Sequence, residues 1–287
     1  MQANQADVAI IGGGPAGIAT AQQCVREGIE EVVVFEAEAV GGLIRYANEV
    51  ENWPGFAGDA GPAVVDSLRD VLDQYDIPVR KETITRVEES HECFTLHVEG
   101  ENETLKNRLE TETVVIATGT RPKSLGYPDE IHEPSWRDYD GERVLIIGGG
   151  DVAYDYALRI DSLGGAVTLL RRSQPKALES LVDRARNRGI DELVGEVEHC
   201  RRNDGGYVLI GPEWTVSGET LVTAIGREPV KPELGFDPGD VTFPAGETDR
   251  EGCYIVGSVA LGKYRQTSLA WGMGIAAGMT IATDHSP

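Results

Sequence analysis

The first forty residues contain two short apolar runs separated by one amphipathic stretch. Residues 7–11 and 31–36 are rich in Val and Ile, and residues 15–27 between them place apolar and polar side chains on opposite helical faces. This order predicts two buried parallel strands joined by a helix, which is the βαβ unit.

The same order returns in the second half of the chain. It predicts strands at 143–147 and 166–170 and a helix at about 151–163. Each unit also has a closing partner, because TVVIATGTRP at 113–122 and TLVTAIGREP at 220–229 share a strand followed by a glycine turn. An internal duplication of this kind predicts two related nucleotide-binding domains.

The order of these pieces predicts nested domains. Glycine and proline mark two crossings, at Gly119–Pro122 and at Gly226–Pro229, as is typical of short, stiff linkers. We therefore predict an α/β fold of two Rossmann-like (three-layer ββα) dinucleotide-binding domains, the second inserted into the first. The predicted bounds are 1–119 and 228–287 for the first domain and 120–227 for the second.

A glycine-rich turn follows the first strand of the first unit. Gly12, Gly14 and Gly17 have the G-x-G-x-x-G spacing, and Glu36 ends the next strand. Such a turn lets the pyrophosphate of a dinucleotide approach the helix N-terminus, and the acid accepts hydrogen bonds from a free ribose 2′-hydroxyl. This loop predicts a dinucleotide without a 2′-phosphate.

The second turn differs at the position of the acid. Counting 24 residues on from Gly12 reaches Glu36, whereas 24 on from Gly148 reaches Arg172. Arg171, Arg172 and Lys176 suit a 2′-phosphate, because a guanidinium group matches phosphate oxygens in a bidentate manner. We predict NADPH rather than NADH; the alternative is a basic surface patch. Together the two loops indicate a flavoprotein that takes hydride from NADPH.

The charge balance excludes some partners. The chain has 287 residues, with 48 acidic against 26 basic side chains and a net charge of −22. Binding to nucleic acid is therefore not expected. No apolar run is long enough for a membrane span, so we predict a cytoplasmic protein. The charge favours a salt-adapted source, and an ordinary acidic enzyme is the alternative.

The four cysteines, at positions 24, 93, 200 and 253, include no C-x-x-C pair. They predict neither a disulfide framework nor a metal site. Cys24 falls on the first helix and is expected to be a small core residue.

The run EAEAVGGLIRYANEVENWPGF at 36–56 resembles thioredoxin reductase. The resemblance continues through ATGTRP, IGGGDVAYDYA, RRSQPKA, AIGREP and VGSVALGKYRQTSLAWGMGIAAG, and it covers essentially the whole chain. It implies FAD in the outer domain, NADPH in the inserted domain, and a homodimer.

The matched positions imply the site residues. Asn52 is expected to contact the isoalloxazine edge, and Asp155 either transfers protons or is a helix-surface carboxylate. For FAD the matched residues are Gly12, Gly14, Pro15, Ala16, Glu36, Gly41, Gly42, Asn52, Gly119, Gly257, Ser258, Arg265 and Gln266. For NADPH they are Gly148, Gly150, Asp151, Val152, Ala153, Arg171, Arg172, Lys176 and Gly226.

The departures from the family pattern matter as much. The family has a C-x-x-C just upstream of the second glycine turn, and this chain has no cysteine between Arg121 and Glu142. A dithiol relay needs one thiolate and a second, resolving thiol, so thioredoxin reduction by that route is excluded. Ser258 replaces an acid that holds the ribityl chain, Leu43 replaces a polar residue, and Trp271 replaces a small residue facing the flavin.

These observations predict an FAD enzyme that passes electrons from NADPH to an acceptor other than thioredoxin. Ferredoxin, flavodoxin, a quinone, oxygen or a small molecule would serve as acceptor. One alternative is direct reduction of a low-molecular-weight disulfide. Another is a non-catalytic nucleotide sensor or complex subunit.

Overall fold

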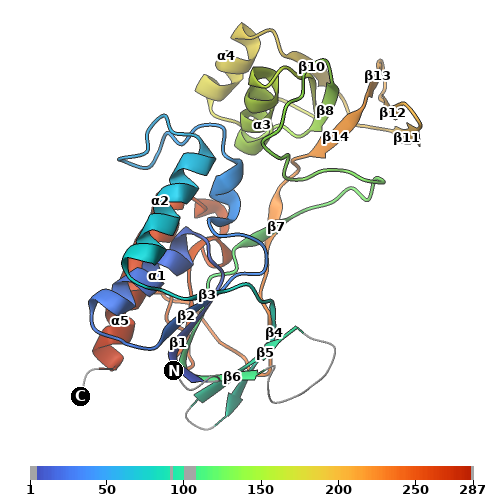
Figure 1. Cartoon of the computed structure of the whole chain (residues 1–287). Helices are drawn as coiled ribbons and strands as arrows, with labels where there is room; N and C mark the ends of the chain where they lie inside the picture. The colour runs from blue at the N-terminus through green and yellow to red at the C-terminus, as the bar shows by residue number, and fades with distance from the viewer. Residues whose placement is uncertain (1–4, 91–92, 100–107, 286–287) are drawn as a thin grey trace. The chain divides into compact units, whose positions relative to one another are not determined.

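The computed structural model describes residues 5–90, 93–99 and 108–285 (Figure 1). The chain divides into two compact units. The first unit comprises Met1–Arg45, Val50–Arg121 and Pro229–Pro287, and the second comprises Tyr46–Glu49 and Pro122–Glu228. The chain therefore passes between the units four times.

The first unit contains a mixed sheet with helices. Its strands are β1 (Gln5–Ile11), β2 (Val32–Phe35), β3 (Val79–Arg80), β4 (Ile84–Ser90), β5 (Cys93–Val98), β6 (Arg108–Ile116), β16 (Glu233–Leu234) and β17 (Cys253–Ile255). Its α-helices are α1 (Pro15–Arg26), α2 (Gly61–Gln74) and α5 (Thr267–Asp284), and its 3-10 turns are η1 (Gly42–Tyr46), η3 (Gly257–Val259) and η4 (Gly262–Tyr264).

The strand order of this sheet is β16-β4-β5-β6-β1-β2-β3, and β17 also pairs with β6. The strands β6, β1, β2 and β3 run parallel, whereas β4, β5 and β6 pair antiparallel. The parallel strands β1 and β2 are buried along nearly their whole length, as expected for strands covered on both faces.

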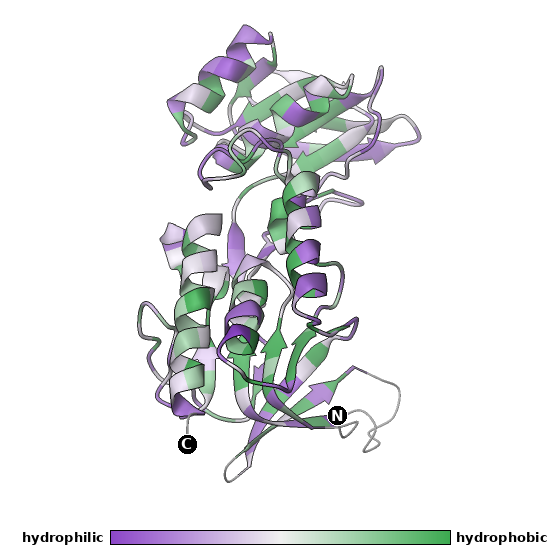
Figure 2. Cartoon of the chain, turned by 60° about the vertical axis from the view of Figure 1, so that its left-hand side comes forward, coloured by the Kyte–Doolittle hydropathy of each residue, from purple (hydrophilic) through white to green (hydrophobic). Residues whose placement is uncertain are grey.

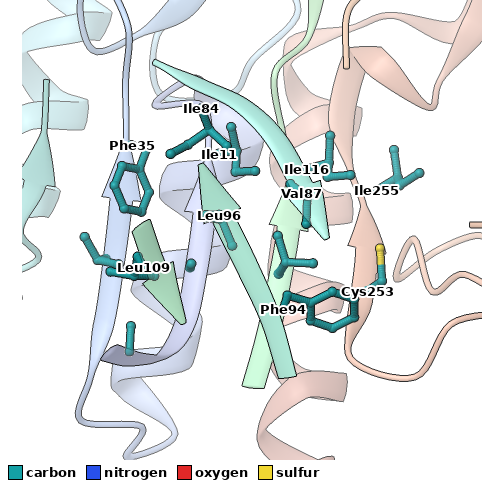
Figure 3. Packing of buried hydrophobic residues seen from close by; sticks show 14 of the residues in the cluster. Ile11, Phe35, Ile84, Val87, Phe94, Leu96, Leu109, Ile116, Cys253 and Ile255 are labelled. Atoms are coloured by element: carbon teal, nitrogen blue, oxygen red, sulfur yellow. The ribbon is translucent and has the colours of Figure 1, made fainter. Parts of the chain in front are cut away.

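Buried apolar side chains from six strands form the core of the first unit (Figure 3). Phe35 of β2, Ile116 of β6 and Ile255 of β17 are each at most 1% exposed. Burying such side chains is the main favourable contribution to the folding of this unit.

Helices α1 and α5 pack closely because α5 carries glycines on the contact face. A Cβ atom on Gly274 would lie closer than 3.0 Å to the Ala16 carbonyl oxygen, and one on Gly278 would lie 2.6 Å from the Gln23 Cβ. Figure 2 shows α5, which leads to the C-terminus, coloured mostly white to green along its length. The glycines therefore fix where α1 begins relative to α5.

The second unit repeats the βαβ plan. Its elements are β8 (Arg143–Ile147), α3 (Asp151–Ser162), β9 (Ala166–Arg171), α4 (Glu179–Asn187), β10 (Asp191–Val194), β11 (His199–Asn203), β12 (Gly206–Ile210), β13 (Thr215–Gly218) and β14 (Thr220–Thr223). The parallel sheet has the order β10-β9-β8-β14, and β11-β12-β13 form a separate antiparallel sheet. At two of the chain crossings, β7 (Thr120–Pro122) pairs with β15 (Arg227–Pro229).

The predicted α/β class with two Rossmann-like domains is confirmed by this architecture and by the solved structures described below. The helices α2 and α4 were not predicted. Among the described residues, no helix is both long and apolar enough to cross a membrane.

Candidate nucleotide-binding sites

The first glycine turn connects β1 to α1. The Gly12 N–H donates to the Phe35 carbonyl (2.7 Å), and Gly12 has φ +116°. A Cβ atom there would lie closer than 3.0 Å to the Ala117 carbonyl oxygen. Gly14 is the N-cap of α1 and supplies no side-chain hydrogen bond, so the helix N-terminus keeps its N–H groups available for an anion.

Glu36 stands beside this turn. Its Oε2 accepts a hydrogen bond from the Gly13 N–H (2.8 Å), and its Oε1 accepts one from the Glu38 N–H (2.9 Å). Both oxygens retain further acceptor capacity. The carboxylate is thus fixed at the loop, where it can accept hydrogen bonds from ribose hydroxyls.

Three further glycines approach the start of α1. The Gly41 N–H donates to the Gly13 carbonyl (2.8 Å), and a Cβ on Gly42 would lie 3.3 Å from the Gly14 Cα. A Cβ on Gly257 would lie 2.6 Å from that of Ala16. The fold therefore brings the glycines of three distant segments together around one helix N-terminus.

The residues predicted at the flavin end also lie together. The Asn52 side chain donates to the side chain of Gln266, the N-cap residue of α5. Beside Asn52, the Trp53 ring centroid lies 4.9 Å from Phe56 and 5.3 Å from Trp271. Asn52 and Gln266 are thus linked to each other and lie next to a cluster of three aromatic rings.

Four other residues of interest in this unit lie in turns. Arg265 is exposed just before α5, and Ser258 lies in η3. Gly119 has φ +70° after β6. Leu43, one of the departures from the family pattern, is 37% exposed in η1.

The second glycine turn has the same design. A Cβ on Gly148 would lie 2.5 Å from the Ala224 carbonyl oxygen and 2.9 Å from the Ala153 Cβ. Gly150 is the N-cap of α3 and again supplies no side-chain hydrogen bond. Gly226 has φ +109° after the closing strand β14. These features fit a second pyrophosphate at the start of α3.

The first residues of α3 differ in their surroundings. The Asp151 carboxylate accepts a hydrogen bond from the Leu178 N–H (2.8 Å), so Asp151 ties the following loop to the helix. Val152 is 45% exposed, whereas Ala153 is fully buried.

The three predicted phosphate-binding cations are not equivalent. Arg171 is 10% exposed and forms an ion pair with Glu192 (2.7 Å). Arg172 and Lys176 are exposed, and the Lys176 backbone N–H donates to the Gly149 carbonyl (2.7 Å). Arg172 and Lys176 therefore present their charges to solvent next to the glycine turn.

Asp155 holds a neighbouring segment of the second unit. Its Oδ2 accepts a hydrogen bond from the Asn48 N–H (2.9 Å). Burial raises the pKa of this carboxyl to about 6, although the Asn48 N–H and Arg159 oppose the increase. Arg159 is fully buried on the same helix and donates to the Tyr46 carbonyl, and Arg184 pairs with Glu49 (2.6 Å). A role for Asp155 in proton transfer stays a prediction.

We expect the Asp155→Asn variant to be more stable than the parent at pH 8. The folded-state pKa of about 6 exceeds the ordinary value of 3.8, so ionising Asp155 lowers the stability of the folded state as the pH rises from about 4 to 6. The gain at pH 8 is of the order of 2 kcal/mol and disappears near pH 4. Thermal unfolding at both pH values measures it, with Asp161→Asn on the same helix as the control. A lower midpoint for Asp155→Asn at pH 8 would contradict this interpretation.

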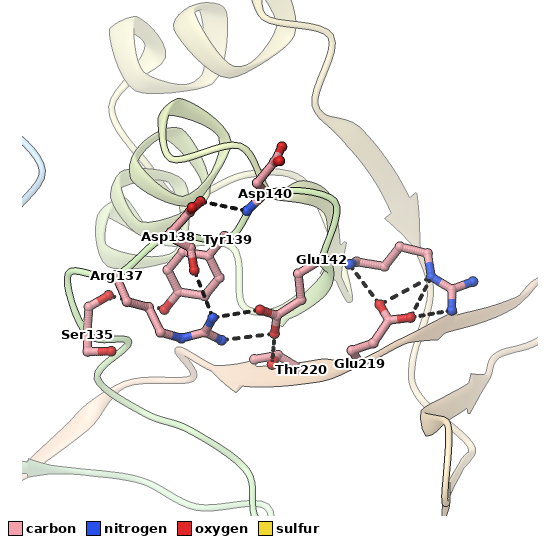
Figure 4. A network of polar contacts seen from close by, with 9 residues as sticks. Ser135, Arg137, Asp138, Tyr139, Asp140, Glu142, Glu219 and Thr220 are labelled. Atoms are coloured by element: carbon pink, nitrogen blue, oxygen red, sulfur yellow. Dashed lines mark hydrogen bonds and ion pairs between the residues drawn. The ribbon is translucent and has the colours of Figure 1, made fainter.

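Hydrogen bonds and ion pairs connect the residues of the stretch upstream of the second glycine turn (Figure 4). Arg137 pairs with Glu142 (2.7 Å), and Thr220 donates to the same carboxylate. Tyr139 is 1% exposed. The Arg137 guanidinium lies over its ring, with the Arg137 Cζ 3.9 Å from the ring centroid. These contacts hold the segment 135–142, which we call the strap, within the second unit.

The four cysteines are unbonded. Burial raises the pKa of Cys24 to about 12 and that of Cys253 to about 11. Thiols with such pKa values are protonated at neutral pH and are poor nucleophiles. Neither buried cysteine is suited to a dithiol relay.

Comparison with known proteins places these sites in context. The family model of the pyridine nucleotide-disulphide oxidoreductases matches residues 6–274, so the chain belongs to this family. A thioredoxin reductase of Mycolicibacterium smegmatis is 28% identical over 94% of each chain. A ferredoxin–NADP reductase of Ignicoccus hospitalis is 27% identical over 83% of this chain and 79% of its own.

Two solved structures have the same fold. The thioredoxin reductase of T. acidophilum superimposes with a TM-score of 0.85 at 21% identity, covering 98% of this chain and 99% of its own. The bacillithiol disulfide reductase of Bacillus cereus gives 0.77 at 20% identity, covering 98% and 100%. The resemblance to thioredoxin reductases predicted from sequence is thus confirmed.

The protein is an FAD-dependent NAD(P)H oxidoreductase of this family, whose thioredoxin reductases use FAD and NADPH. The residues fit both cofactors. Gly12 and Gly148 leave no room for a Cβ atom, and each turn opens a helix without a side-chain cap. Among the described residues, a carboxylate is bound to the first turn alone.

Sequence reasoning missed Glu192, which belongs to no recognisable motif. It also missed that the segment Tyr46–Glu49, part of the run at 36–56, binds Asp155. Their roles depend on pairings between residues far apart in sequence, such as Arg171 with Glu192 and Asn48 with Asp155.

Proposed function

We propose that this enzyme passes electrons from NADPH through FAD to an acceptor other than thioredoxin, such as a ferredoxin or flavodoxin, a quinone, oxygen or a small molecule. When bound, FAD supplies the chemistry, since it accepts two electrons from NADPH and donates them onward. The absence of a cysteine pair carries the proposal: the chain has no C-x-x-C, and its two buried thiols have raised pKa values.

The residues of the chain have defined tasks in this proposal. Glu36 accepts hydrogen bonds from the ribose of FAD, and the N-terminus of α1 binds its pyrophosphate. Asn52 and Gln266 position the isoalloxazine ring, and the N-terminus of α5 stabilises negative charge on it. In the second unit, the N-terminus of α3 binds the pyrophosphate of NADPH.

An acceptor panel tests the proposal. The holoenzyme is bleached with NADPH under anaerobic conditions in a stopped-flow instrument, and each candidate acceptor is then mixed with it. We expect rapid return of the yellow colour with at least one carrier, quinone or small molecule, and none with a thioredoxin disulfide. Reoxidation by thioredoxin at rates comparable to the other acceptors would refute the proposal.

Trp271 controls access to the flavin in this proposal, because its indole lies with Trp53 beside Asn52. We expect Trp271→Ala to raise NADPH-dependent oxygen consumption about tenfold, which corresponds to a barrier lower by about 1.4 kcal/mol. Loss of indole quenching should also raise flavin fluorescence. Phe243→Ala, which removes a ring that is 70% exposed in the same unit, is the control. Unchanged oxygen consumption in Trp271→Ala would exclude shielding.

A second candidate is direct reduction of a low-molecular-weight disulfide at the flavin. The similarity in fold to a bacillithiol disulfide reductase favours it. Disulfide-dependent NADPH oxidation without oxygen would support this candidate over a carrier, and failure across a panel of small disulfides would end it.

Three further properties belong to the proposal. We propose that the enzyme is a cytoplasmic homodimer and that its net charge of −22 reflects adaptation to salt. Sedimentation tests the homodimer, and activity at molar KCl tests the adaptation to salt.

A protein that purifies without flavin, or whose flavin is not bleached by NADPH, would instead favour a non-catalytic sensor or complex subunit.

A further inference from the structure

The turn that follows β9 is fixed at both ends. The Arg171 Nη1 donates to the Ser173 carbonyl (2.7 Å), and the Lys176 N–H donates to the Gly149 carbonyl (2.7 Å). A Cβ atom on Gly149 would lie 3.3 Å from the Arg171 Cβ, so the turn packs directly against the second glycine loop. Charges on this turn are therefore held at the place where the ribose end of a dinucleotide binds.

The guanidinium of Arg171 already has a partner. Its Nε donates to the Glu192 Oε2 (2.7 Å), and both side chains are nearly buried, at 10% and 12% exposed. The Tyr154 hydroxyl also donates to this oxygen (3.3 Å). A charge pair in such a site is poorly screened by solvent, so most of the charge of Arg171 is neutralised by Glu192.

The second carboxylate oxygen of Glu192 has no hydrogen-bond partner among the described residues. The nearest recorded cation to that oxygen, the Arg186 Nε, lies 3.8 Å away. Without Arg171, Glu192 would leave a buried and poorly compensated negative charge close to the 2′-phosphate. Truncating one member of a buried charge pair is costly mainly because the other member stays unpaired.

We propose that Arg171 is a positioning residue for NADPH specificity: it neutralises the buried carboxylate of Glu192, and the 2′-phosphate is bound by Arg172 and Lys176. This goes beyond the assignment of all three cations as direct ligands, and it rests on NADPH being the electron donor. Arg171 contributes by neutralising Glu192.

A double-variant cycle tests the proposal on the FAD-loaded protein. The probes are 2′,5′-ADP and 5′-AMP, which differ only in the 2′-phosphate, and calorimetry at fixed salt measures their affinities. We expect Arg171→Gln to weaken 2′,5′-ADP binding about tenfold, because the uncompensated charge of Glu192 then repels the phosphate. Binding of 5′-AMP should change less than about twofold, because that ligand lacks the repelled group.

The double variant Arg171→Gln/Glu192→Gln decides between the two roles. We expect 2′,5′-ADP affinity to return to within about threefold of the parent, because the repulsive charge is gone. Arg172→Gln should instead lose about tenfold with or without Glu192→Gln. If the double variant stays as weak as Arg171→Gln, Arg171 contacts the phosphate directly and the proposal is overturned.

Two more measurements keep the test decisive. Glu192→Gln alone frees the charge of Arg171, which then acts as a third cation, so 2′,5′-ADP binding should tighten about threefold. Weaker binding by Glu192→Gln would overturn the proposal. This measurement does not depend on whether Arg171→Gln folds. Arg188→Gln, which breaks the 3.0 Å pair with Asp161 on the same unit, is the control for losing one positive charge. If the parent binds 5′-AMP as tightly as 2′,5′-ADP, the assignment of NADPH itself fails.

Discussion

Replacing Gly12 by alanine is expected to give a protein that purifies without FAD. The added Cβ would lie closer than 3.0 Å to the backbone of Ala117, and a φ of +116° is unfavourable for alanine. Relief requires the turn to move away from β6, and that displaces the N–H groups at the start of α1. The flavin absorbance per protein chain measures the loss.

Gly28→Ala is the matched control for this variant. Gly28 lies in the same unit with φ +96°, but no atom of the described residues lies within 4 Å of an added Cβ. It should therefore suffer the backbone strain, of the order of 1 kcal/mol, and retain its flavin. Full FAD content in Gly12→Ala would contradict the assignment of the first glycine turn.

Gly148→Ala is expected to weaken the binding of NADPH and to leave the binding of FAD intact. Its Cβ would lie 2.5 Å from the Ala224 carbonyl oxygen and 2.9 Å from the Ala153 Cβ. The second glycine turn must shift, whereas the first unit is untouched. We expect a yellow protein whose flavin is bleached by dithionite but whose affinity for NADPH falls at least about tenfold, the effect of losing about 1.4 kcal/mol of binding.

Gly126→Ala serves as the control in the second unit. Gly126 has φ +77° and lies outside the glycine turn, and an added Cβ would meet no atom within 4 Å in the part of the chain that the structure describes. Its bleaching by NADPH should match the parent. If Gly148→Ala retained parental NADPH affinity, or lost FAD, the two turns would not serve separate nucleotides.

The sequence predicted the parts of the fold that local patterns encode. The glycine turns, α1, α3 and the flanking strands follow from apolar runs and from glycines that a close backbone approach requires. The helix α2 was missed although its buried residues Val64, Val65, Leu68 and Leu72 have helical spacing. That stretch carries no motif.

The candidate sites were less predictable, because ion pairing cannot be inferred from a motif. The run Arg171-Arg172 looks like two equivalent phosphate ligands, yet Glu192 on the neighbouring strand β10 pairs with only one of them. Likewise, Asp155 bonds to a segment 107 residues away along the chain. Such partners become visible only when the strands and helices are placed in space.

The contacts of the strap upstream of β8 also could not be inferred from the sequence. The sequence shows that the cysteines are missing, but not what replaces them. The structure places an ion pair between Arg137 and Glu142 there, together with the buried ring of Tyr139. The segment is therefore part of the packing of the second unit.

An anaerobic reductive titration tests most directly whether electrons leave the flavin without a protein dithiol. Dithionite is added stepwise to the holoenzyme while flavin absorbance is followed. Because FAD alone takes up electrons, bleaching should be complete at about two electron equivalents per flavin. An uptake of about four, as a flavin together with a reducible disulfide would require, would contradict the account.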